Sequence, residues 1–240
     1  MIGTGPGAVE YLSLRARDAL ASAEVIVGYK TYIDLIRDYI GNREIVSTGM
    51  TREIERCRKA VELASSGRRV AVISSGDPGV YGMAGLVLEI MEAEGLLGTI
   101  PVEIIPGITS ATASAARLGA PLMHDFAVIS LSDLLTPWDT IEQRLEAAAR
   151  ADFVIVLYNP ASKKRTWQIE KAREIFLRHK PPGTPVGIVK NAAREEESLI
   201  ITTLRDLPAH PVDMLSTVII GNRSTRRAGD FMITPRGYQV

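Results

Sequence analysis

The chain is poor in the residues that support several common kinds of site. A single cysteine, Cys57, occurs among 240 residues. This count excludes an internal disulfide, a cysteine zinc cluster and a CxxC redox pair. Cys57 lies between Arg56 and Arg58 in a stretch with a helical pattern, so we interpret it as an incidental helix residue rather than a nucleophile. The histidines are scattered and form no HxxxH or HExxH motif, so no metal site is expected; they are His124, His179 and His210.

The chain also lacks an excess of charge of either sign and a long apolar run. It has 28 basic and 28 acidic residues, and its formal net charge is zero. Proteins that bind duplex DNA or anionic membranes usually carry a basic excess, so neither nucleic acid nor membrane is an expected partner. No apolar run reaches the roughly 18 residues of a membrane helix. A Gly-rich loop begins almost at once where a secretory leader would stand, and we expect a cytoplasmic protein.

Hydrophobic residues make up 46% of the chain and aromatic residues only 5%, so aliphatic side chains must fill most of the core. Short β-branched runs alternate with longer helical patterns, which predicts an α/β fold with largely parallel sheets. The expected strands are Glu24–Val27, Arg69–Ser74, Val102–Ile105, Phe126–Leu131, Phe153–Tyr158, Val186–Val189, Leu199–Thr203 and Ser216–Ile220. The expected helices are Ser13–Ala23, Glu53–Ser66, Leu86–Glu94, Thr109–Leu118, Pro137–Arg150 and Thr166–Arg178.

A domain boundary is expected near Gly119-Ala120-Pro121, which gives two α/β domains, residues 1–119 and 120–240. The last two expected strands follow one another without a long helix, so the second domain should contain a mixed sheet. One helix start is well marked. Thr136 is the expected N-cap, with Pro137 at the first helical position and Asp139 as a capping-box acid. The apolar face of this helix should consist of Ile141, Leu145, Ala148 and Ala149.

The first Gly-rich loop, Gly3-Thr4-Gly5-Pro6-Gly7, differs from the dinucleotide-binding fingerprint. Pro6 removes a backbone donor and the third glycine comes one position early. By spacing alone, a tight turn without a ligand is as good an interpretation as a binding loop. Only Met1 and Ile2 precede the loop, so the strand before it is either very short or trimmed.

Two further loops follow expected strands and lead into helices. Ser74–Gly85 contains the run Ser-Gly-Asp-Pro-Gly, and Ile105–Ala111 contains Pro-Gly-Ile-Thr. Ligands of open α/β sheets bind at the carboxyl ends of strands, and glycines allow a ligand to approach the backbone closely. The alternatives are that Asp77 caps its own turn and that Thr109 only caps the following helix.

Together these loops resemble those of the tetrapyrrole methylase family, and the resemblance runs from Gly3 to Tyr238. A second series of motifs is similar to those of precorrin-3B C(17)-methyltransferases, a branch of that family. The motifs specific to this branch are Gly28-Tyr29-Lys30-Thr31-Tyr32, Ser47-Thr48-Gly49-Met50, Gly119–Phe126, Ser130–Trp138, Tyr158–Lys163 and Thr234–Tyr238.

The resemblance implies two α/β domains with the active-site cleft between them. The methyl donor would be S-adenosylmethionine, leaving as S-adenosylhomocysteine, and the substrate would be precorrin-3B, which is methylated at carbon 17 with ring contraction to precorrin-4 in cobalamin synthesis. It implies a homodimer as well. The implied contacts of the donor are Pro6, Ser75, Gly76, Asp77, Val80, Thr109, Ser110, Tyr158, Asn159 and Ala192.

Ring contraction expels a carbon of the macrocycle and requires proton transfer, for which His124 and Asp125 are the general acid–base candidates. The alternative is that Asp125 orders its loop and His124 is an exposed side chain. Basic residues such as those of Lys163-Lys164-Arg165 could pair with the carboxylates of a precorrin rim, or be solvated surface charges.

Other functions stay open at this stage. The substrate could be cobalt-factor III or another tetrapyrrole of the corrin pathway. The chain could be an RNA ribose methyltransferase of the same superfamily, which the neutral charge disfavours. It could also be a non-catalytic module that binds S-adenosylmethionine or a nucleotide.

Overall fold

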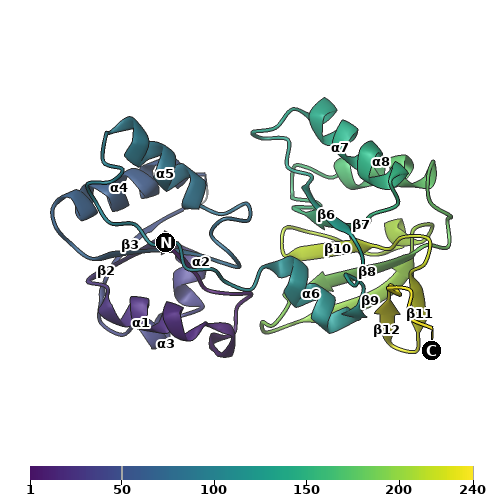
Figure 1. Cartoon of the computed structure of the whole chain (residues 1–240), viewed down its shortest axis with the longest axis horizontal. Coiled ribbons are helices and arrows are strands. Elements are labelled where there is room, and N and C mark those ends of the chain that lie inside the picture. The colour runs from purple at the N-terminus through teal and green to yellow at the C-terminus, as the bar shows by residue number, and fades with distance from the viewer. Residues whose placement is uncertain (50, 240) are drawn as a thin grey trace. The chain divides into compact units, whose positions relative to one another are not determined.

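The computed structural model describes residues 1–49 and 51–239 (Figure 1). The chain forms two compact units, Met1–Ser110 and Ala111–Val240. The domain boundary expected from the sequence lies further along, between Gly119 and Ala120. Most of the intervening helix, α6 (Ser110–Leu118), therefore groups with the second unit. Met50, which ends one of the sequence motifs, lies outside the described residues.

The first unit contains a parallel sheet of order β1-β4-β2-β3. Its strands are β1 (Ile2–Gly3), β2 (Val25–Tyr29), β3 (Glu44–Thr48) and β4 (Val70–Ser74). The apolar runs of β2 and β4 occupy the centre and are largely buried, as expected for strands covered on both faces. The strand before the first glycine loop is present with two residues.

Helices pack on both faces of this sheet. They are α1 (Leu14–Ser22), α2 (Lys30–Asp34), α3 (Arg37–Ile40), α4 (Glu53–Ser65) and α5 (Ala84–Ala93), with a short 3-10 turn at Val9–Tyr11. Leu20 of α1 packs with Ile26 of the sheet, whereas Cys57 of α4 packs with Val27. Because adjacent residues of a strand point to opposite faces, Ile26 and Val27 divide the core into two layers.

The second unit has a sheet of order β6-β7-β10-β8-β9. Its strands are β6 (Phe126–Ser130), β7 (Val154–Tyr158), β8 (Pro185–Lys190), β9 (Ser198–Thr203) and β10 (Ser216–Ile220). Strands β6 and β7 are parallel, and the other pairs are antiparallel. The expectation of a mixed sheet is thus confirmed. A smaller sheet joins β5 (Gly119–Ala120), β11 (Arg226–Ala228) and β12 (Phe231–Ile233).

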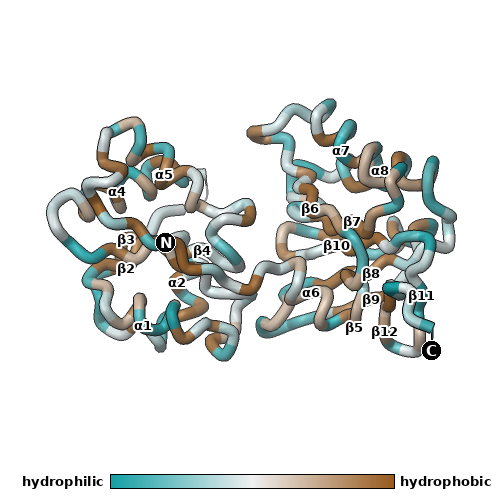
Figure 2. The backbone as a smooth tube through the Cα atoms, viewed as in Figure 1, coloured by the Kyte–Doolittle hydropathy of each residue, from teal (hydrophilic) through white to brown (hydrophobic). Residues whose placement is uncertain are grey.

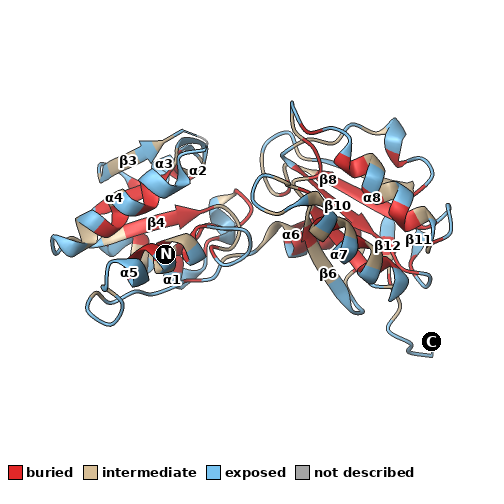
Figure 3. Ribbon diagram, turned by 90° about the horizontal axis from the view of Figure 1, so that it is seen from above, coloured by how far each residue is buried: buried red, intermediate tan, exposed pale blue. Residues whose placement is uncertain are grey.

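Helices α7 (Trp138–Arg150) and α8 (Gln168–Leu177) cover one face of the larger sheet, and α6 packs on the other. A 3-10 turn, Leu207–Ala209, follows β9. Phe176 of α8 is fully buried against β7, β8 and β10. Figure 3 shows the central strands of this unit as buried and the outer helix faces as exposed.

Two local predictions are wrong. Val102–Ile105 forms no strand and makes only an isolated bridge, between Ile105 and Ile2. Its partner β1 ends after two residues, so there is no ladder for the rest of the segment to join. Helix α7 begins at Trp138 and its N-cap is Pro137 rather than Thr136, with no side-chain capping bond. Its predicted apolar face is buried as expected, and consists of Ile141, Leu145, Ala148 and Ala149.

Candidate cofactor and substrate site

Three loops of the first unit meet at the carboxyl ends of β1 and β4. Gly5 and Gly76 exchange backbone hydrogen bonds of 3.2 and 2.7 Å. The amide of Gly3 donates to the carbonyl of Ile105 over 2.9 Å, which brings in the third loop. The three loops that the sequence singled out therefore lie together in this unit.

Glycine is required where the three backbones touch. A Cβ atom on Gly107 would stand 2.1 Å from the carbonyl oxygen of Gly76, and one on Gly3 would stand 2.5 Å from the amide nitrogen of Gly107. Gly76 itself has φ +67°, a conformation that favours glycine. The three loops are therefore packed backbone against backbone, and glycine is needed at these positions for that close approach.

Asp77 joins two of these loops. Its Oδ1 accepts a hydrogen bond from the amide of Gly79 over 2.8 Å, and its Oδ2 accepts one from the amide of Gly107 over 3.0 Å. The first bond is the self-capped turn considered from the sequence, and the second ties that turn to the Pro-Gly-Ile-Thr loop. The carboxylate thus fixes loop geometry.

The other donor-contact candidates of this unit lie on the same loops. Pro6 is buried, and Ser75, Thr109 and Ser110 are half-buried. Val80 is 36% exposed, which leaves an apolar side chain open to a ligand beside the glycines. The structure thus places every first-unit candidate on these three loops.

In the second unit, Tyr158 and Asn159 lie at the carboxyl end of β7. The Tyr158 hydroxyl accepts a hydrogen bond of 2.7 Å from the amide of Ala111, in the first turn of α6. Asn159 has φ +51°, and its Nδ2 donates to Oγ of Ser130 over 3.0 Å. Ala192 is buried in the cluster against which Tyr158 packs. These second-unit candidates therefore share one end of the sheet.

His124 and Asp125 lie at the opposite end. They precede β6, whose last residue, Ser130, pairs with Tyr158. A strand rises about 3.3 Å per residue, so the length of β6, roughly 15 Å, separates them from Tyr158 and Asn159. The structure does not bring these general acid–base candidates together with the second-unit donor contacts.

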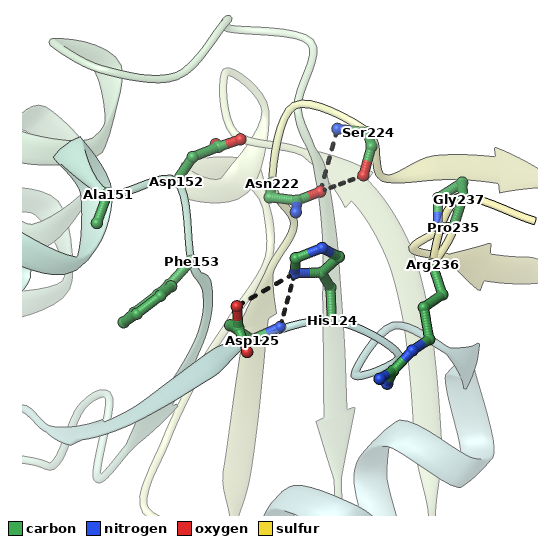
Figure 4. Close-up of a pocket in the computed structure, with 10 residues that line it drawn as sticks. All are labelled: His124, Asp125, Ala151, Asp152, Phe153, Asn222, Ser224, Pro235, Arg236 and Gly237. Carbon is green, nitrogen blue, oxygen red and sulfur yellow. Dashed lines mark hydrogen bonds and ion pairs between the residues drawn. The ribbon is translucent and has the colours of Figure 1, made fainter.

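His124 and Asp125 line a separate pocket of about 380 Å³ (Figure 4). The backbone amide of Asp125 donates to Nδ1 of His124 over 2.9 Å. Both side chains are well exposed, at 49% and 77%. Asn222 and Asp152 also line the pocket, but Asn222 Oδ1 is engaged by Ser224 and Thr225 within its own turn.

Arg165 lies beside the candidate Asn159, and its burial was not predicted from the sequence. It is only 8% exposed, and its Nη1 donates to the carbonyls of Asn159, over 2.5 Å, and Leu131, over 3.2 Å. Burial lowers the pKa of its guanidinium group. Arg165 thus ties together the loops that follow β6 and β7. In the sequence it follows two lysines, and nothing there distinguishes it from a surface charge.

The fold with two α/β units and strand-end glycine loops is shared with a class of methyltransferases. The model of the tetrapyrrole (corrin/porphyrin) methylases matches residues 1–208. A probable cobalt-factor III C(17)-methyltransferase of Salmonella typhimurium is 52% identical over 100% of this chain and 99% of its own length. The solved structure of the methyltransferase CobJ has a TM-score of 0.90 and 40% identity, and the match covers 98% of both chains.

Some relatives are longer proteins. A cobalt-factor III methyltransferase of Priestia megaterium is also 52% identical over 100% of this chain, which spans 45% of that relative's length. A structure of uroporphyrin-III C-methyltransferase from Thermus thermophilus, complexed with S-adenyl homocysteine, has a TM-score of 0.69 and 25% identity over 92% of this chain and 95% of that one. The chain belongs to the tetrapyrrole methylase family, whose methyl donor is S-adenosylmethionine.

The structure offers no candidate for a membrane-crossing helix, since none of the helices in residues 1–49 and 51–239 combines the necessary length and apolarity.

Proposed function

We propose that the chain methylates cobalt-factor III at carbon 17, with ring contraction, using S-adenosylmethionine. The sequence motifs suggested metal-free precorrin-3B first and cobalt-factor III as an alternative. The relative from Salmonella typhimurium, which matches this chain end to end at 52% identity, is named for cobalt-factor III, and this observation carries the proposal. Here the cobalt belongs to the substrate.

The three glycine loops of the first unit would hold the donor, and the contacts that the resemblance implies for Tyr158, Asn159 and Ala192 stay a prediction. When bound, S-adenosylmethionine supplies a methyl group already activated on a sulfonium. The protein must then align the donor with an electron-rich ring carbon, and orientation of this kind accounts for about 7–11 kcal/mol of a barrier. The close packing of Gly76 on Gly107, and the two hydrogen bonds that Asp77 accepts, hold these loops in one arrangement and support the proposal.

The proton transfers of ring contraction remain assigned to His124 and Asp125 as a prediction. Their sequence motif supports this assignment, whereas their exposed position before β6 does not. A His124→Asn variant tests it directly. If His124 transfers the proton, this variant should bind both ligands and methylate slowly or stop before contraction. Activity equal to that of the wild type would remove His124 from the mechanism.

The test of substrate is a pair of anaerobic incubations with S-adenosylmethionine, one with cobalt-factor III and one with precorrin-3B. Mass spectrometry of the pigment and release of S-adenosylhomocysteine are followed together. One extra methyl on cobalt-factor III, with the spectrum of a contracted ring, is the expected result. Methylation of precorrin-3B alone would restore the substrate first suggested by the motifs.

The same assay distinguishes the two other functions that the sequence left open, a non-catalytic binding module and an RNA methyltransferase. Binding of S-adenosylmethionine without release of S-adenosylhomocysteine on either pigment would indicate a binding module. Transfer of labelled methyl to RNA would indicate a ribose methyltransferase. A mass measurement in solution tests the proposed homodimer.

A further inference from the structure

The loop between β6 and α7 holds two leucines almost fully in solvent. Leu134 is 81% exposed and Leu135 is 97% exposed. In Figure 1 this loop projects from the second unit, and its tip has the brown colour of apolar residues in Figure 2. Isolated exposed apolar side chains are common, whereas here two leucines stand together at the tip of a loop and offer adjacent apolar surface to a ligand.

The loop is anchored at its base. Asp133 Oδ2 accepts a hydrogen bond of 2.9 Å from Nε2 of Gln168, which is 2% exposed. Beyond the leucines, the rings of Trp138 and Trp167 pack edge to face with centroids 4.7 Å apart. The loop that carries the leucines is therefore held in place at both ends. This reduces the conformational entropy that the loop loses when a ligand binds.

The segment after β7 lies beside this loop and contributes cations. Arg165 bonds to the carbonyl of Leu131, and Trp167 and Gln168 make the contacts just described. Lys163 and Lys164 on this segment are exposed, and neither forms an ion pair with another residue that the structure describes. The two leucines thus lie on one segment, and two lysines without an ion pair among the described residues lie on the neighbouring segment, which contacts the base of the same loop.

Both segments follow the carboxyl ends of β6 and β7, the end of the sheet at which Ser130, Tyr158 and Asn159 lie. This surface is therefore continuous with the second-unit part of the candidate site.

We propose that Leu134 and Leu135 pack against a face of the tetrapyrrole macrocycle while Lys163 and Lys164 pair with carboxylates on its rim. This inference rests on the proposed function and identifies residues that position the substrate. A tetrapyrrole combines a flat apolar face with a carboxylate-bearing edge, which is the combination that this surface complements. Charged hydrogen bonds to the rim would fix the orientation of the ring on the leucines.

The test compares three variants of the full chain, each saturated with S-adenosylhomocysteine. They are L134S/L135S, the conservative L134M/L135M, and Leu14→Ser, which changes a leucine that is 78% exposed on α1. The dissociation constants of cobalt-factor III and precorrin-3B are measured anaerobically by absorbance, and that of S-adenosylhomocysteine by calorimetry. We expect L134S/L135S to raise the dissociation constant of the pigment at least tenfold. The other two variants should stay within threefold of wild type, and all should bind S-adenosylhomocysteine normally.

A second prediction distinguishes the contribution of the lysines to pigment binding from that of the leucines. K163Q/K164Q should weaken pigment binding and also reduce its dependence on salt, whereas L134S/L135S should leave the salt dependence unchanged. If the serine variant fails to fold, Leu135→Ala alone provides the comparison, since that side chain makes almost no contact to lose.

Several outcomes would overturn the inference. If the wild type methylates a pigment and L134S/L135S binds it equally well, the inference fails while the proposed function stands. The inference also fails if the serine variant changes only the molecular mass in solution, because the leucines would then contact a second copy of the chain. If the wild type binds neither pigment, the proposed function fails and the inference fails with it.

Discussion

Asp77 illustrates how a carboxylate in a ligand loop can act through geometry. Both of its oxygens accept backbone amides, from Gly79 and Gly107, so no further role in proton transfer is needed to explain its presence. An asparagine can accept only one of these bonds and would turn its NH₂ group toward the other amide. Leaving a donor unsatisfied in this way costs about 1–3 kcal/mol.

We therefore expect Asp77→Asn to weaken S-adenosylhomocysteine binding by roughly tenfold or more, because about 1.4 kcal/mol of lost binding energy corresponds to a factor of ten. Calorimetric titration measures the change. Asp38→Asn, at an exposed position of α3, is the matched control and should bind normally. Equal affinities for the two variants would show that the carboxylate does not hold the loops in their binding form.

Cys57 is fully buried in α4, and burial raises the pKa of its thiol from 9.0 to about 11. The thiolate is the reactive form, so native protein at pH 8 should resist iodoacetamide and react only after unfolding in guanidinium. Mass spectrometry of the alkylated chain measures this. Rapid alkylation of the native protein would contradict the burial of Cys57.

The same pKa shift predicts a dependence of stability on pH. The folded-state pKa is raised, so the stabilisation is complete below pH 9 and is lost as the pH rises through about 11. Wild type should lose about 2–3 kcal/mol more than Cys57→Ala between these limits. Denaturant titrations of both proteins at a series of pH values supply the comparison.

Residue positions in the site were predictable where a motif fixes them and not elsewhere. The glycine loops were found because their glycines and Asp77 have a recognisable spacing. Arg165 was considered only as a partner of substrate carboxylates or as a surface charge, because a buried arginine that bonds backbone carbonyls has the same local sequence as a solvated one. The distance between His124 and Tyr158 could not be predicted from the sequence either, because it depends on the direction of β6 and on the register of its pairing with β7.

At the level of elements, the buried strands were predictable from their continuous β-branched runs, and β2, β4, β7 and β10 appear where expected. Strand β3 was missed because it is an edge strand with an irregular exposure pattern. The small sheet of β5, β11 and β12 was missed because two- and three-residue strands have no measurable period.

The close approach of Gly107 to Gly76 gives a prediction about how the loops between elements affect stability. In Gly107→Ala the new Cβ would meet the carbonyl of Gly76 at 2.1 Å, and neither backbone can move without breaking the hydrogen bonds of the loops. We expect a loss of several kcal/mol in the free energy of unfolding or an insoluble chain. Gly85→Ala, within α5 and with open space around its Cβ, should instead gain about 0.5–1 kcal/mol. Chemical denaturation measures both, and equal stabilities would contradict the close approach.

At the scale of the whole molecule, each unit has its own apolar core on both faces of its sheet. The α/β class and the family were predictable, because alternating patterns and motifs extend over the whole chain. The sequence leaves the choice between cobalt-factor III and precorrin-3B open, because the cobalt of the substrate needs no ligand from the chain.

Phe176 tests the core of the second unit. Replacing this fully buried side chain by alanine should lower the free energy of unfolding by about 3–5 kcal/mol, through lost burial and a residual cavity. Phe231→Ala, at a position that is 57% exposed, should cost clearly less. Thermal and urea unfolding of the two variants measure the difference, and similar losses would place Phe176 outside the core.

The meeting of Gly3, Gly76 and Gly107 also limits how this protein can be engineered. Since backbone packs against backbone there, substitution of these glycines cannot adjust the shape of the proposed donor site. Acceptance of an enlarged methyl-donor analogue would have to come from positions with side chains, such as Val80 or Thr109. A saturation library restricted to those positions should yield altered donor preference, whereas one on the three glycines should yield mostly unfolded protein.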